Sequence, residues 1–202
     1  MKIAMPFVVL GALALTACPP PPAPPSGTAD AAVPDESADV AATGEAGDAP
    51  TPYTAEQIRD ASRPGRTYRY LVEIPGAPNA VREIRFEAVD VESATLRSTT
   101  TDEAGNVLQA TEPMTVAWEE LRRHALFPQD AVELTEAEVT VPAGTFVCVV
   151  YTVTTAEGVE VYQFAKDLPG PPVRFWTEAG GARTMTSTLV EYLPGTEAAG
   201  SP

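Results

Sequence analysis

The sequence predicts a mainly β domain, a curved antiparallel sheet or half-barrel of about eight strands with one or two short helices. Three observations indicate this fold. Apolar and polar residues alternate with period two through most of residues 68–192, and helical periodicity is confined to two short segments. Clusters of Pro and Gly interrupt the alternation at intervals of roughly ten residues, which is typical of a sheet that curls.

The first predicted element is a helix over residues 55–61. Thr54 at its N-cap and Gln57 three residues later fit a capping box, in which each side chain bonds the other residue's backbone N–H. Helical signs return in residues 117–124 and end before Pro128. The domain is therefore expected to carry two minor helices.

The strand pattern fills the rest of the domain. In the first strand Tyr68, Tyr70 and Val72 alternate with the charged residues Arg69 and Glu73. The expected strands, in order, cover residues 68–74, 83–88, 91–101, 107–112, 132–141, 145–155, 159–166, 172–177 and 183–192.

Residues 102–106 separate two of these strands and have the composition of a hairpin loop. Asp102, Glu103 and Asn106 also offer the oxygen ligands that calcium prefers. The segment lacks both the Asp-x-Asp-x-Asp-Gly spacing and the distal bidentate Glu of a calcium loop. A hairpin tip is the favoured interpretation.

The N-terminal residues resemble an export signal. Lys2 is followed by an uncharged apolar run from Ile3 to Leu15, the layout of a secretory signal peptide. Leu15-Thr16-Ala17-Cys18 resembles the lipobox of bacterial lipoproteins. The resemblance implies cleavage before Cys18 and a lipid anchor on that cysteine. A transmembrane helix would need about 20 apolar residues, more than this run supplies; a cleaved signal without lipid is the other alternative.

The expected organisation has four parts. They are a signal peptide over residues 1–17, a lipidated cysteine with a disordered Pro, Ala and acidic linker over 18–52, a globular domain over 53–194, and a flexible tail over 195–202. Residue 19 is Pro and not Asp, and by the sorting rule of enterobacteria-like cells this implies the outer membrane. The predicted location is therefore the cell envelope, with the domain facing the periplasm.

The charge distribution argues against nucleic acid as a partner. The net charge is −15, and no Lys or Arg occurs between Cys18 and Ile58. The largest basic cluster in the sequence is the Arg122-Arg123 pair, whereas a nucleic-acid site needs a cationic face. The expected partners are the membrane, reached through the anchor, and an apolar ligand or an envelope protein.

No catalytic motif stands out, and we expect a non-enzymatic protein without metal or cofactor. The sole histidine, His124, ends a predicted helix, and zinc sites need several His or Cys ligands. Cys148 lies in an apolar run and is expected to be a small buried residue. Gly-x-Ser-x-Gly and phosphate-binding loops are absent from the sequence.

Aromatic residues are frequent in the predicted strands. Two interpretations stay open: an ordinary core, or a hollow inside the curled sheet that could hold an apolar ligand. The residues concerned are Tyr68, Tyr70, Phe86, Phe146, Tyr151, Tyr162, Phe164, Phe175, Trp176 and Tyr192.

Two hairpins carry a family resemblance. Residues 139–146, which contain Pro-Ala-Gly-Thr-Phe, and residues 164–174 are similar to consecutive turns of an uncharacterised family of bacterial envelope proteins. The resemblance implies an open β-barrel distantly similar to the lipoprotein carriers of the Lol system. It carries over no functional residue. Two functions are therefore expected as alternatives: a membrane-anchored module that binds an apolar or lipid-like ligand, or a structural or assembly partner in an envelope complex.

Overall fold

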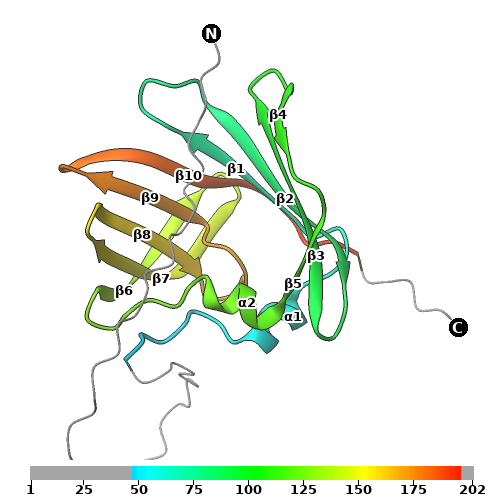
Figure 1. Ribbon diagram of the computed structural model, residues 1–202, viewed down its shortest axis with the longest axis horizontal. Helices are drawn as coiled ribbons and strands as arrows, with labels where there is room; N and C mark the ends of the chain where they lie inside the picture. The colour runs from blue at the N-terminus through cyan, green and yellow to red at the C-terminus, as the bar shows by residue number, and fades with distance from the viewer. Residues whose placement is uncertain (1–46, 197–202) are drawn as a thin grey trace, which may run out of the picture. The chain divides into compact units, whose positions relative to one another are not determined.

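The computed structural model describes residues 47–196 (Figure 1). The predicted signal peptide, Cys18, most of the predicted linker and the last six residues of the predicted tail lie outside this range. No helix within it is long and apolar enough to cross a membrane.

Ten strands form one antiparallel sheet, so the predicted fold class is confirmed while the strand count exceeds the expected eight. The strands are β1 (Thr67–Glu73), β2 (Ala80–Val89), β3 (Ser93–Asp102), β4 (Val107–Ala110), β5 (Met114–Ala117), β6 (Val132–Val141), β7 (Gly144–Thr155), β8 (Gly158–Ala165), β9 (Arg174–Ala179) and β10 (Ala182–Leu193). Sequence patterning missed β5, because it is four residues long and buries only Val116.

The strand order is β4-β3-β2-β1-β10-β9-β8-β7-β6, and β5 pairs with β3 beside β4. Two pairings join strands that are not consecutive in the chain: β5 with β3, and β1 with β10, which joins the two halves of the domain. Register shifts at Arg69/Tyr70 and at Phe86/Ala88 mark irregularities of the β-bulge kind. Such bulges increase local twist, and the sheet accordingly curls into an open half-barrel (Figure 1).

Two short helices lie across the open side of the curled sheet (Figure 1). Helix α1 (Ala55–Ala61) has the predicted capping box, with Thr54 Oγ1 accepting from the Gln57 N–H at 3.1 Å. Helix α2 (Trp118–Arg123) packs against α1 and joins β5, near one edge of the sheet, to β6 at the other edge. The β5–α2–β6 connection therefore spans the mouth of the half-barrel.

The core confirms the expected burial of Cys148, which is completely shielded from solvent. Burial raises the pKa of its thiol to about 11, and its Sγ lies 3.7 Å from the carbonyl oxygen of Phe146. Residues 102–106 form the predicted hairpin tip, where the Asp102 N–H donates to the Asn106 carbonyl at 2.9 Å. Among the described residues, no group of three or more His, Cys, Asp and Glu could hold a metal ion.

The packed region begins before the predicted boundary at residue 53. Ala49 is buried, and its N–H donates to the Phe127 carbonyl at 2.9 Å. The Tyr151 hydroxyl donates to the Pro50 carbonyl at 2.7 Å. Residues 47–52 therefore contribute backbone groups to the packed domain.

Candidate functional site

The described domain contains a partly enclosed hollow of about 500 Å³. It lies between the inner face of the sheet at β2 and β3 and the two helices. Small-molecule sites in proteins commonly measure about 300–1,000 Å³ and are lined mostly by apolar and aromatic groups. The size of this hollow therefore suits a small ligand.

The sheet wall of the hollow follows from strand periodicity. Ile84 and Phe86 are two residues apart on β2, so they project from the same face. The antiparallel register places Phe86 opposite Leu96 and Ile84 opposite Ser98 on β3. Because Phe86 is buried and its neighbours line the hollow, this face is the inner one.

The opposite wall comes from the helices and is sparse in apolar groups. Ile58 of α1, Leu121 of α2 and Ala125 just beyond α2 line it. Helix α1 has seven residues and buries only Ile58, and α2 has six and contributes Trp118 and Leu121, so together they direct few large apolar side chains toward the sheet. Two such short helices are too small to fill the space beneath the sheet.

The aromatic part of the lining is rigid. The ring of Phe164 meets Tyr53 edge-on at 6.1 Å and stacks with Tyr162 at 6.1 Å. The Tyr53 hydroxyl donates to the Ala165 carbonyl, which fixes the ring. Burial raises the pKa of both Tyr53 and Tyr162 well above the ordinary range, so both phenols are neutral at physiological pH.

The charged part of the lining is mostly cationic. Arg82, Arg97 and Arg122 border the hollow, with Glu112 as its one acidic residue. His124 also borders it, directly after α2 as the sequence predicted. Strand pairing and helix packing bring these residues together from segments far apart in the chain, so no basic cluster is visible in the sequence.

The three arginines differ in their partners. Arg97 Nε lies 2.5 Å from Glu87 Oε1. Nη2 of the buried Arg122 lies 2.5 Å from Glu119 Oε1. Arg82 Nε donates to Ser98 Oγ at 3.2 Å. Within residues 47–196 no carboxylate lies within 4.0 Å of Arg82, so its charge has no ion-pair partner there.

The predicted aromatic residues divide between the two interpretations. Those that line the hollow are Phe86, Tyr162 and Phe164. Those buried elsewhere in the core are Tyr68, Tyr70 and Tyr151, with Phe146 and Tyr192 packed against them. Phe175 stacks on Tyr162 at 4.6 Å, and Trp176 lies beneath Arg183 at 4.5 Å. Patterning missed Tyr53 as a lining residue, because it sits outside any strand.

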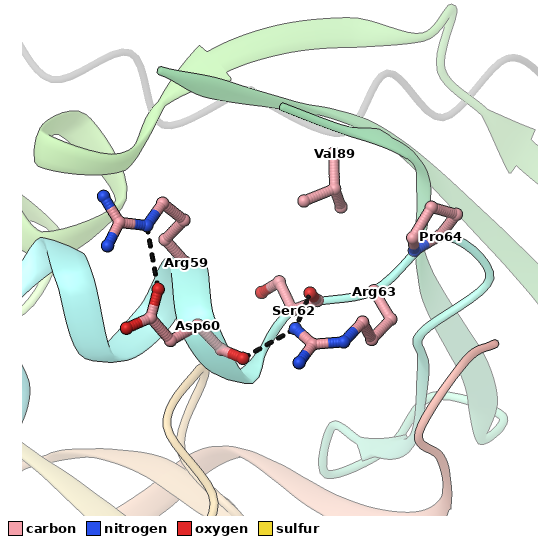
Figure 2. Close-up of a pocket in the computed structure, with 6 residues that line it drawn as sticks. All are labelled: Arg59, Asp60, Ser62, Arg63, Pro64 and Val89. Carbon is pink, nitrogen blue, oxygen red and sulfur yellow. Dashed lines mark hydrogen bonds and ion pairs between the residues drawn. The ribbon is translucent and has the colours of Figure 1, made fainter. Parts of the chain in front are cut away.

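A second depression, of about 380 Å³, lies beside α1 (Figure 2). Its polar groups are already engaged with one another: Arg59 Nε lies 2.9 Å from Asp60 Oδ1, and an Arg63 guanidinium nitrogen donates to the Asp60 carbonyl at 2.6 Å. Its apolar lining consists of Pro64 and Val89. This depression therefore offers neither the apolar area nor the available polar groups of the hollow.

Comparison with known proteins finds fold likenesses among solved structures. No family model matches the chain, and no curated protein matches its sequence. It is similar to an exported protein of Bacteroides fragilis with a YmcC-like fold, at 11% identity and a TM-score of 0.44, over 65% of this chain and 97% of that one.

The chain is also similar to MucB, at 13% identity and a TM-score of 0.45, over 71% of this chain and 58% of MucB. MucB in complex with MucA(peri) matches at 14% identity and a TM-score of 0.44, over 68% of this chain and 55% of that one. The chain thus spans somewhat more than half the length of MucB.

Proposed function

We propose that this protein is an envelope lipoprotein whose domain binds an apolar or lipid-like ligand in the hollow between the sheet and the helices, without enzymatic activity. The single observation that carries the proposal is the hollow itself, about 500 Å³ lined mainly by apolar side chains. A domain of this size would ordinarily fill such a space with its own side chains, because interiors pack closely.

Burial of apolar surface favours an apolar ligand in the hollow. Each apolar Å² that a ligand removes from water contributes about 25 cal/mol. Ile84, Leu96 and Leu121 are only partly buried, and each contributes apolar surface to the hollow that a ligand could cover. The rigid Phe164 and Tyr53 rings need no reordering to receive it, which lowers the entropic cost of binding.

The binding proposal is tested with Nile red, a neutral apolar dye, added to the chain without its leader, residues 19–202. We expect saturable dye binding, and we expect Leu121→Trp to weaken it because the larger side chain occupies part of the hollow. Leu193→Trp is the matched control, since Leu193 is 43% exposed and lies outside the hollow. Equal binding by both variants, or none by the unmodified chain, would refute the proposal.

The anchoring proposal rests on the lipobox resemblance of Leu15-Thr16-Ala17-Cys18. Several acyl chains on Cys18 would hold the protein at a membrane stably, whereas one chain alone binds only marginally. We expect Cys18→Ala to yield unprocessed precursor or protein released from the membrane, and density-gradient fractionation to place the unmodified protein with outer-membrane markers. Continued labelling of Cys18→Ala by a fatty-acid analogue would contradict this assignment.

An assembly role is the second candidate, and one surface feature favours it. Val107 and Leu108 on β4 are each more than 60% exposed, and β4 pairs with β3 at one edge of the sheet. Exposed apolar side chains on an edge strand are a recognised site for protein association. If Val107→Lys with Leu108→Lys abolishes co-purification of an envelope protein while dye binding persists, both functions coexist.

A further inference from the structure

We propose that the hollow selects an amphiphile with a single anionic head, a carboxylate or a phosphate, and that Arg82 receives this head. The inference deepens the proposed function and rests on it. It concerns the charge of the ligand, which the apolar lining alone leaves open.

The charged residues around the hollow differ from those of the chain as a whole. The chain carries 28 acidic residues against 13 Lys and Arg. The lining of the hollow holds three arginines and one glutamate, and Glu87 and Glu119 pair with two of these arginines, which leaves Arg82 without a carboxylate within 4.0 Å among residues 47–196. The pKa of the Arg97 guanidinium is raised chiefly by its hydrogen bond to Glu87 and also by the nearby charge of Glu112, so the charge of Glu112 is partly balanced within the lining.

Arg82 lies at one end of the apolar wall of the hollow. Arg82, Ile84 and Phe86 follow one another at intervals of two on β2 and share its inner face. Phe86 is 3% exposed, whereas Arg82 is exposed. The row therefore runs from a charged, solvated end to a dry apolar end, which matches the head and tail of an amphiphile.

Arg82 has guanidinium N–H donors available for a ligand. A guanidinium has five N–H donors, and the structure engages Nε with Ser98 Oγ. Arg97 and Arg122 already hold Glu87 and Glu119. Arg82 can thus offer the planar pair of donors that binds a carboxylate or phosphate in a bidentate manner. A neutral head group would not form this charge-assisted interaction, and a cationic head group would be repelled by the positive charge of Arg82.

The test compares three ligands with one tail: decanoate, decanol and decylammonium, titrated into residues 19–202 by calorimetry at pH 8 below their aggregation thresholds. We expect decanoate to bind about tenfold more tightly than decanol, as one charge-assisted contact implies, and decylammonium to bind least. Arg82→Gln should bring decanoate to the level of decanol, while Arg82→Lys should retain part of the preference.

Arg85→Gln is the matched control, because Arg85 is an exposed arginine on the same strand with the opposite parity and lies outside the hollow. It should leave all three affinities unchanged. If decyl phosphate binds as tightly as decanoate, the site also accepts phosphate head groups. If decyl phosphate does not bind, the proposal that the site accepts a phosphate is overturned. Equal affinity for decanoate and decanol would overturn the inference but leave the proposed function intact, whereas no binding of any ligand would overturn both. A decanoate preference that survives Arg82→Gln would overturn the role of Arg82.

Discussion

Two arginines under the same sheet have contrasting surroundings. Arg66 is completely buried, and its guanidinium carbon lies 4.9 Å from the Tyr68 ring centroid and 5.5 Å from that of Tyr192. Arg82, on β2, is exposed beside the hollow. We call the packed region around Arg66, Tyr68, Tyr192 and Leu189 the filled region.

The contrast shows what decides whether the inner face becomes core or site. In the filled region, large side chains from neighbouring strands meet one another, and the loop before β9 covers them through the Pro169 carbonyl, which accepts from Arg66 at 2.8 Å. At the hollow, the sheet faces two helices of seven and six residues. The same strand pattern therefore gives a core or a binding surface according to what lies opposite.

Arg66→Ala should have the largest effect on stability. It removes a fully buried side chain, opens a cavity and leaves the Pro169 carbonyl without this donor. We expect the free energy of unfolding to fall by about 3–4 kcal/mol, measured by urea denaturation. Arg85→Ala, an exposed arginine, should change it by less than about 0.5 kcal/mol. Similar effects of the two changes would contradict the distinction between the regions.

A pair of identical substitutions compares the regions directly. Leu189 is completely buried in the filled region, and Leu189→Ala should cost about 3 kcal/mol of unfolding free energy. Leu96 lines the hollow and is partly exposed, so Leu96→Ala should cost only about 1 kcal/mol. If the hollow were packed core, the two losses would be equal in thermal or chemical denaturation.

Gly170 tests how tightly the loop before β9, which also borders the hollow, packs on the filled region. A Cβ at this position would collide with the Tyr68 hydroxyl, and the backbone φ of 153° disfavours other residues. Gly170→Ala should therefore lower the free energy of unfolding by about 2–3 kcal/mol. Gly76→Ala is the control, because its φ is 80° but nothing lies within 4 Å, so it should cost only about 1 kcal/mol. Equal losses would show that backbone strain alone is responsible.

The free energy of unfolding should fall gradually at alkaline pH. Burial raises the pKa of Cys148 from 9.0 to about 11 and that of Tyr151 from 10.0 to about 12. Above pH 9 the unfolded chain loses these protons first, so stability falls as pH rises through the folded-state values. Each group contributes up to about 1.4 kcal/mol per pH unit in its interval. Denaturation curves of Cys148→Ala should show a shallower decline between pH 9 and 11, and an unchanged slope would contradict the assignment.

Much of the fold could be predicted from the sequence because its signals are local. The period-two runs and the capping box at Thr54 depend on neighbouring residues, and both appear in the structure. Strand β5 escaped prediction because four residues with one buried side chain carry no visible period. The sequence did not predict the packing of Ala49, because its backbone hydrogen bond to Phe127 does not depend on composition.

The candidate site was predictable only in outline. The aromatic strands suggested a hollow, but its cationic border could not be seen. Arg82, Arg97 and Arg122 are separated in the chain and come together through the pairing of β2 with β3 and the path of α2. Long-range pairing also places Arg66 near Tyr192, more than a hundred residues away. Such contacts depend on the assembled sheet and on no local pattern.

The most direct test of the account is a methyl NMR titration of residues 19–202 with decanol. We expect saturable shifts in the methyl signals of Ile84, Leu96 and Leu121, which line the hollow, with Leu189 and Val173 in the packed interior unchanged. Shifts confined to Val107 and Leu108 on β4, or no saturable shift at the three hollow methyls, would contradict it.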